Sequence, residues 1–268
     1  MTPAGLSPRR RILLGVTALL GVAALLTVLG PFVASDLLGQ RRDVPAADRP
    51  GPVLLVPGYG GGTAGLSVLA DRLRATGRKA TVVELPGTGT DDLAGQARVL
   101  DGYVTRELRA GAPSVDVVGY SAGGVVVRFW VQAYDGPRKA RRVVTLGSPH
   151  HGAELAGTGS LLVPDACPAA CQQLAPGSRF LAGLRSPVPV PPLWLSLWTV
   201  DDRTVTPPES ARLDGAVNVP IQSVCPGRQV SHSELPTDPV VTAMVVAALG
   251  TGALAADVPG CEVRPGGA

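Results

Sequence analysis

The chain has 268 residues, of which 45% are hydrophobic and 17% charged, so its composition excludes a disordered chain and its length suffices for one large domain. Its formal net charge is +3, and residues 1–35 hold three arginines and no acidic residue. The rest of the chain therefore has 21 basic and 21 acidic residues, with no surplus of positive charge for binding nucleic acid.

The N-terminal segment has the pattern of a membrane-targeting signal. Three arginines at positions 9–11 precede an uncharged, largely apolar stretch from Ile12 to Ser35. A basic flank followed by about 20 apolar residues is typical of a signal peptide or a membrane anchor. We expect residues 1–35 to be either a cleaved signal peptide or an uncleaved signal-anchor helix. Both alternatives place the rest of the protein outside the cytoplasm, secreted or held in the cell envelope by residues 12–35.

Residues 36–51 contain the charged, proline-bearing sequence QRRDVPAADRP and predict a linker to a domain over residues 52–268. In this domain, short apolar runs predict strands at 53–56, 80–85, 115–118, 142–146, 193–200 and 217–224. Helical spacing of apolar residues predicts helices at 66–75, 93–110, 123–134 and 239–249. Strands that alternate with helices predict an α/β fold, a mostly parallel sheet with helices on both faces.

The alternation stops over residues 153–192, which are rich in proline, glycine and alanine. A loop of about 40 residues without structure of its own is uncommon in a compact domain unless it is functional. We therefore expect a cap or lid over a site. A disordered insertion is the alternative.

Four cysteines fit an exported protein, because disulfides persist outside the cytoplasm. Cys167 and Cys171 are close in sequence, whereas Cys225 and Cys261 are not, which favours the pairs Cys167–Cys171 and Cys225–Cys261. A zinc site is the alternative, but no further cysteine or histidine stands near the first pair at ligand spacing. We expect no metal.

A candidate nucleophile lies in the sequence Gly-Tyr-Ser-Ala-Gly at 119–123. This G-x-S-x-G pattern follows one predicted strand and opens the next helix, where it forms a sharp turn that exposes the serine. The turn needs small residues two positions to either side, and Gly119 and Gly123 supply them. The sequence therefore predicts that Ser121 is a nucleophile.

A serine hydroxyl needs a base that takes its proton, and the chain has three histidines. His150 and His151 follow the strand after the nucleophile, whereas His232 lies between the last predicted strand and the last helix. With this serine turn the chain order is nucleophile, acid, base. We expect His232 to be the base and the other two histidines to be structural or at the rim.

The acid that orients the base is expected at the carboxyl end of the strand after the predicted lid. That strand ends in Asp201 and Asp202, and its sequence alone leaves both as candidates.

Attack on an ester produces an oxyanion that needs preset N–H donors. The backbone N–H of Ala122, next to the nucleophile, is one candidate. We expect the other to be the N–H of Tyr59, in the glycine-rich turn after the first strand. Phosphate binding is the weaker reading of this turn, because it lacks the signatures of nucleotide-binding loops.

These residues resemble the α/β-hydrolase superfamily and, more narrowly, the bacterial class 2 triacylglycerol lipase and esterase family. The resemblance covers about residues 53–249. It is carried by the sequences VPGYGG (56–61), GYSAGG (119–124), TLGSPHHG (145–152), DRTV (202–205), LDGAVNV (213–219) and SHSEL (231–235).

The resemblance implies an α/β-hydrolase fold with a cap or lid insertion, and hydrolysis of carboxylic esters without metal or organic cofactor. In the family the acid precedes an x-x-Val step, which selects Asp202, and the base precedes the last helix, which matches His232. The chain has Pro57 before the glycine of the oxyanion turn, and Tyr120 before the nucleophile, where many relatives have histidine. We expect Tyr120 to alter only the wall of the pocket.

The sequence thus predicts an exported serine ester hydrolase that cleaves acyl esters or lipids through an acyl-enzyme on Ser121. An acyltransferase that uses the same three residues on envelope lipids is one alternative, and a non-catalytic surface-binding module is another. Because Cys225 and Cys261 flank His232 in the sequence, we also expect their disulfide to hold the loop that carries the base.

Overall fold

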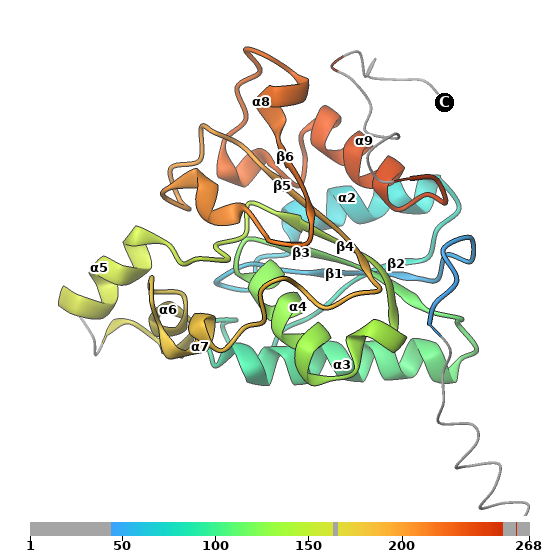
Figure 1. Cartoon of the computed structure of the whole chain (residues 1–268), viewed down its shortest axis with the longest axis horizontal. Helices are drawn as coiled ribbons and strands as arrows, with labels where there is room; N and C mark the ends of the chain where they lie inside the picture. Colours follow the sequence, from blue (N-terminus) through green and yellow to red (C-terminus); the bar gives the residue numbers. More distant parts are fainter. Residues whose placement is uncertain (1–43, 163–165, 254–260, 262–268) are drawn as a thin grey trace, which may run out of the picture. The chain divides into compact units, whose positions relative to one another are not determined.

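The computed structural model describes residues 44–162, 166–253 and 261 (Figure 1). The predicted signal segment, residues 1–35, and most of the predicted linker lie outside them. Among the helices of the described residues, none has both the length and the hydrophobicity that crossing a membrane requires.

A parallel sheet forms the centre of the domain. Its strands are β1 (Val53–Val56), β2 (Ala80–Val82), β3 (Val115–Tyr120), β4 (Ala140–Leu146), β5 (Leu193–Trp198) and β6 (Val217–Pro220). They lie in the order β2-β1-β3-β4-β5-β6. β1, β3 and β4 are flanked by strands on both sides, and their aliphatic side chains are fully buried, as expected for a sheet covered on both faces.

Two pairs of helices cover the two faces of the sheet (Figure 1). α3 (Leu93–Arg109) and α4 (Ala122–Ala133) pack together on one face, and α2 (Ala64–Ala75) and α9 (Pro239–Ala248) on the other. Each pair buries its own apolar cluster against the sheet. The predicted alternation of strands and helices, and a mostly parallel sheet with helices on both faces, are therefore confirmed.

The predicted strand at 217–224 is wrong in its second half. β6 ends at Pro220, and Ile221–Val224 forms the short helix α8. Proline has no backbone N–H, so it cannot donate to a strand ladder, and it serves here as the N-cap of α8.

The described part of the segment 153–192, the predicted cap or lid, includes three short helices (Figure 1). They are α5 (Glu154–Leu162), α6 (Ala169–Gln173) and α7 (Arg179–Ala182). α6 and α7 contribute buried apolar side chains to the cluster that α3 and α4 form, whereas α5 has no buried residue. Most of this segment is therefore packed on the body, and α5 stands out from it.

A buried carboxylate ties the chain together at the edge of the sheet where the strands begin. Asp116, in β3, is fully buried and accepts hydrogen bonds from Arg78 at 2.6 Å and from Arg141 at 2.5 Å. Both arginines also donate to the carbonyl oxygen of Leu249, directly after α9. Arg141 also donates to the carbonyl oxygen of Ala47, which precedes β1. Arg141 therefore links the segments before the first strand and after the last helix to this carboxylate.

Candidate active site

Ser121 occupies the sharp turn between β3 and α4. Its φ of 52° lies in the left-handed region, where few residues other than glycine are found. A β-carbon at Gly119 would lie 2.5 Å from Cα of Gly124, and one at Gly123 would lie 2.3 Å from the carbonyl oxygen of Val56. The turn therefore requires the two glycines, as the sequence predicts.

The structure brings Ser121 together with His232 and Asp202, from segments far apart in the sequence. The Oγ of Ser121 lies 3.0 Å from Nε2 of His232, and Nδ1 of His232 lies 2.6 Å from Oδ2 of Asp202. A carboxylate only accepts hydrogen bonds, so the ring proton belongs on Nδ1 and Nε2 is left to accept the serine proton. The three side chains form one hydrogen-bonded line.

The loop after β5 decides which aspartate reaches the histidine. The side chain of Asp202 is 1% exposed, and its Oδ1 accepts from the backbone N–H groups of Thr204 at 2.9 Å and Val205 at 2.8 Å. Asp201 is exposed and accepts from Gln222 at 3.1 Å. The carboxylate of Asp202 is therefore fixed in the line.

The other two histidines make separate contacts. Nε2 of His150 lies 3.2 Å from Oγ1 of Thr145, and Nδ1 of His151 lies 3.2 Å from the carbonyl oxygen of Ser210. Burial, with the nearby charge of Arg128, holds the pKa of His150 well below its usual 6.5, so this ring is neutral. His150 is buried and His151 is exposed, and the structural or rim position expected for both stays a prediction.

An apolar cavity of about 340 Å³ opens beside the serine. Its lining includes Ser121, Ala122 and Tyr59, so both predicted oxyanion residues border the same space as the serine. A β-carbon at Gly58 would lie 2.9 Å from Cβ of Ser121, which shows how closely the glycine-rich turn approaches the serine. The far wall comes from the segment 153–192 and is lined by Ala153, Leu155, Ala156, Gly159, Cys171 and Leu174.

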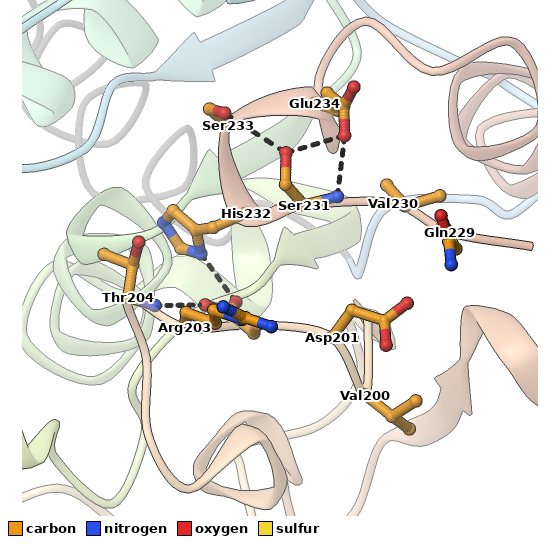
Figure 2. Close-up of a pocket in the computed structure, with 11 residues that line it drawn as sticks. Val200, Asp201, Arg203, Thr204, Gln229, Val230, Ser231, His232, Ser233 and Glu234 are labelled. Carbon is orange, nitrogen blue, oxygen red and sulfur yellow. Dashed lines mark hydrogen bonds and ion pairs between the residues drawn. The ribbon is translucent and has the colours of Figure 1, made fainter.

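A second, polar pocket of about 600 Å³ is bordered by the loop that carries His232 (residues 225–238, here the histidine loop; Figure 2). Asp201 and Arg203 border it from the loop after β5, and Ser231 and Glu234 from the histidine loop. Thr204 lines both this pocket and the apolar cavity. His232 therefore borders the polar pocket, whereas Ser121 borders the apolar cavity.

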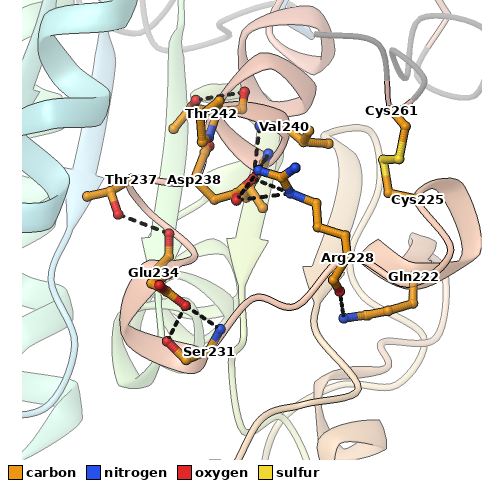
Figure 3. Close-up of polar contacts among 12 residues, drawn as sticks. Gln222, Cys225, Arg228, Ser231, Glu234, Thr237, Asp238, Val240, Thr242 and Cys261 are labelled. Atoms are coloured by element: carbon orange, nitrogen blue, oxygen red, sulfur yellow. Dashed lines mark hydrogen bonds and ion pairs between the residues drawn. A yellow bond between two sulfur atoms is a disulfide. The ribbon is translucent and has the colours of Figure 1, made fainter. Parts of the chain in front are cut away.

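The loop that carries His232 is held at several points (Figure 3). Arg228 forms an ion pair with Asp238 at 2.6 Å, and Asp238 also caps the start of α9 by accepting from the first backbone N–H groups. Between them, Glu234 accepts from the backbone N–H of Ser231 at 2.8 Å and from its hydroxyl at 2.6 Å. These hydrogen bonds with Ser231 lower the pKa of Glu234, so its carboxylate stays charged.

Both favoured disulfides are present. Cys167 is bonded to Cys171 and Cys225 to Cys261. Cys225 is buried at the end of α8, where the histidine loop begins (Figure 3). Cys171 lines the apolar cavity.

Tyr120 does not form part of the pocket wall, contrary to the prediction from the sequence. It is not among the residues that line the apolar cavity. Its hydroxyl instead donates to the carbonyl oxygen of His232 at 3.2 Å. The only signal in the sequence is its position directly before the serine, which does not indicate a partner 112 residues away.

Comparison with known sequences finds relatives among lipases and thioesterases. The palmitoyl protein thioesterase family matches residues 52–178, a region that includes Ser121 and ends before Asp202 and His232. A triacylglycerol lipase of Burkholderia plantarii is 33% identical over 152 residues, which are 53% of this chain and 40% of that protein. A triacylglycerol lipase of Pseudarthrobacter phenanthrenivorans is 34% identical over 113 residues, 39% of this chain and 35% of that protein. The chain thus spans well under half of the length of these two relatives.

Solved structures share the fold at low sequence identity. The crystal structure of Aspergillus fumigatus lipase B aligns with a TM-score of 0.61 and 19% identity, covering 80% of this chain and 55% of that one. The mature form of the Bacillus licheniformis lipase BlEst2 aligns with a TM-score of 0.57 and 18% identity, covering 74% and 91%. The chain therefore shares the α/β-hydrolase fold of these lipases, and part of its sequence is similar to triacylglycerol lipases and to the palmitoyl protein thioesterase family.

Proposed function

We propose that the protein is an exported serine ester hydrolase in which Ser121 is the nucleophile, His232 the base and Asp202 the acid. The observation that carries this proposal is the hydrogen-bonded line of the three side chains at the mouth of an apolar cavity. In this line Nε2 of His232 is placed to take the serine proton, which is the step that a serine hydroxyl needs when it attacks.

The acylation step follows from this geometry. Oγ of Ser121 attacks the acyl carbonyl carbon while its proton passes to Nε2 of His232, 3.0 Å away. The imidazolium that forms is stabilised by the Asp202 carboxylate at 2.6 Å, whose position is fixed by two backbone N–H donors. His232 then gives the proton to the leaving alcohol oxygen as the ester bond breaks, and the acyl group stays on Ser121.

The oxyanion is assigned to the backbone N–H groups of Tyr59 and Ala122. Ala122 is the first residue of α4, so the positive end of the helix dipole faces the developing charge. In the second step, His232 takes a proton from water, whose oxygen attacks the acyl carbon. His232 then returns this proton to Oγ of Ser121 as the bond between the acyl carbon and Oγ breaks and the acid is released.

The apolar cavity is assigned to the acyl group of the substrate, because it gives an acyl chain a place out of water beside the serine. The leading substrates are therefore acyl esters or lipids, and the similarity to a thioesterase family adds acyl thioesters to the compounds worth testing. α5 borders the cavity through Leu155, and we assign the segment 153–192 as its lid.

Export is proposed from two features. Two disulfides fit an oxidising compartment, and the segment before residue 36 has the arginine flank and apolar stretch of a signal peptide or anchor. Cell fractionation of the producing organism, with N-terminal sequencing of the extracted protein, distinguishes a secreted form cleaved near residue 35 from an anchored one.

The activity is tested by hydrolysis of p-nitrophenyl esters with acyl chains of about 2 to 16 carbons, and of the matched acyl thioesters. The test uses the full chain, with Ser121→Ala as the control. Loss of turnover in Ser121→Ala identifies the serine enzyme, and the ratio between ester and thioester rates names the substrate class. A folded protein that is inert on every probe contradicts hydrolysis, and an acyl-acceptor screen then tests the transferase.

A further inference from the structure

Tyr120 contacts His232 in two ways. It is the last residue of β3 and directly precedes Ser121. Its hydroxyl donates to the main-chain oxygen of His232 at 3.2 Å, and its ring lies 5.2 Å from the imidazole, centre to centre, at an interplanar angle of 35°. One side chain therefore touches both the backbone and the ring of the same residue.

The hydroxyl of Tyr120 is a permanent donor. Burial raises the pKa of this phenol to about 12, and the negative charge of Asp202 acts in the same direction. At neutral pH the phenol therefore keeps its proton.

The imidazole of His232 is enclosed on several sides. Asp202 lies at its Nδ1, Ser121 at its Nε2 and the Tyr120 ring alongside. A β-carbon at Gly147 would lie 3.1 Å from Nδ1, so the main chain after β4 closes another side. Among the described residues, Asp202 and Tyr120 contact the ring directly. Asp201, Arg203 and Glu234 line the pocket that borders it, and Glu234 is bound to Ser231.

We propose that Tyr120 is a positioning residue for His232, whose hydroxyl fixes the main chain of the histidine loop and whose ring fixes the imidazole and favours its protonated form. The inference rests on the proposed function, since it concerns the base of that reaction. The two parts of the side chain have separable effects: the hydroxyl sets orientation, and an aromatic face stabilises a nearby cation.

Two variants of the full chain separate these effects. Tyr120→Phe removes the hydroxyl and keeps the ring, so we expect kcat on p-nitrophenyl butyrate to fall about 3- to 10-fold, with KM changed less than about twofold. Tyr120→Leu also removes the ring. Its kcat should fall further, and the acid limb of its kcat/KM profile should move to lower pH by about 0.3 to 0.7 units, because the charged imidazole loses its aromatic neighbour.

Tyr103→Phe is the matched control. Tyr103 lies in α3, and its hydroxyl accepts from the backbone N–H of Glu84 at 3.3 Å, a bond between a phenol and the main chain that is remote from the serine. This variant should keep the kcat and the pH profile of the unchanged protein. Thermal unfolding of every variant shows whether lost activity reflects lost folded protein.

A readout independent of activity completes the test. NMR titration of the imidazole C–H signals follows each of the three histidines, and His232→Gln assigns the relevant one. We expect the His232 titration to move to lower pH in Tyr120→Leu and to stay in place in Tyr103→Phe. A shift in a protein that hydrolyses no ester overturns the proposed function and keeps the positioning role. An unmoved titration with unchanged kcat in both Tyr120 variants overturns the positioning role itself.

Discussion

Gly123 and Val56 approach so closely that a β-carbon on the glycine would lie 2.3 Å from the Val56 carbonyl oxygen. Gly123 belongs to the helix that follows Ser121, and Val56 ends the strand that leads into the turn of Tyr59. The serine turn and the proposed oxyanion turn are therefore in direct backbone contact, and a shift of one moves the other.

This contact predicts that Gly123→Ala lowers kcat for ester hydrolysis by about 100-fold or more, because either the serine turn or the oxyanion turn must move away from the reacting carbonyl. The matched control is Gly102→Ala. Gly102 is exposed in the middle of α3 with no atom within 4 Å of an added β-carbon, so alanine there should keep activity and add about 0.5–1 kcal/mol of stability. Turnover and urea unfolding of both variants check the pair. Full activity in Gly123→Ala would show that the turn tolerates displacement.

Neighbouring aspartates offer a second matched pair. Asp202→Asn should lower kcat by about 10³- to 10⁴-fold, because an amide no longer stabilises the imidazolium and permits the wrong tautomer of His232. Asp201→Asn, on an exposed side chain, should change kcat less than about twofold. Steady-state kinetics on one p-nitrophenyl ester suffices. Equal losses in both variants would contradict the assignment of Asp202.

Gly159 sets a prediction about chain length. It lines the apolar cavity, and a β-carbon there would lie 3.5 Å from Sγ of Cys171, an ordinary contact distance. Alanine should therefore fit, whereas Gly159→Phe should fill part of the cavity and move the preferred acyl chain to fewer carbons. Rates across the p-nitrophenyl ester series measure the shift. An unchanged preference in Gly159→Phe means that the acyl chain lies elsewhere.

The disulfide between Cys225 and Cys261 is predicted to hold the histidine loop. Removing it in the double variant Cys225→Ala with Cys261→Ala leaves the Cys167–Cys171 bond in place, and the chain-entropy estimate puts the loss of stability at about 3–4 kcal/mol. We expect activity to fall at temperatures below the unfolding transition, because the loop loosens first. Activity and circular dichroism followed on one temperature ramp test this order; coincident losses would show that the bond stabilises only the whole domain.

Buried His150 makes stability depend on pH. Its pKa is lowered in the folded protein, chiefly by burial, so below its usual 6.5 the unfolded chain binds a proton that the folded chain does not. The free energy of unfolding therefore falls as pH falls below 6.5, by at most about 1.4 kcal/mol per pH unit from this group. Urea unfolding at pH 7 and pH 5 should show a smaller difference in His150→Gln than in the unchanged protein. An equal difference assigns the acid sensitivity to other groups.

Local patterns of apolar residues in the sequence predict most of the strands and helices. The apolar runs and helical spacing placed strands and helices within a few residues of their bounds, and the serine turn was visible because its glycines are adjacent in sequence. The prediction of a strand over 217–224 is wrong after Pro220. The apolar run continues there, but proline has no N–H to donate to the neighbouring strand. Tyr120 was missed for another reason: its partner is a main-chain oxygen distant in sequence, and no residue type marks such a contact.

The cluster around Asp116 also fixes where the chain enters the domain. Arg141 links this carboxylate to Ala47 and to Leu249, at the edge of the sheet where the strands begin, whereas Ser121 follows the opposite, carboxyl end of β3. A resin, electrode or fusion partner joined at residue 44 would therefore attach close to this edge of the sheet. The protein can be immobilised through that edge while Ser121 lies at the opposite end of β3.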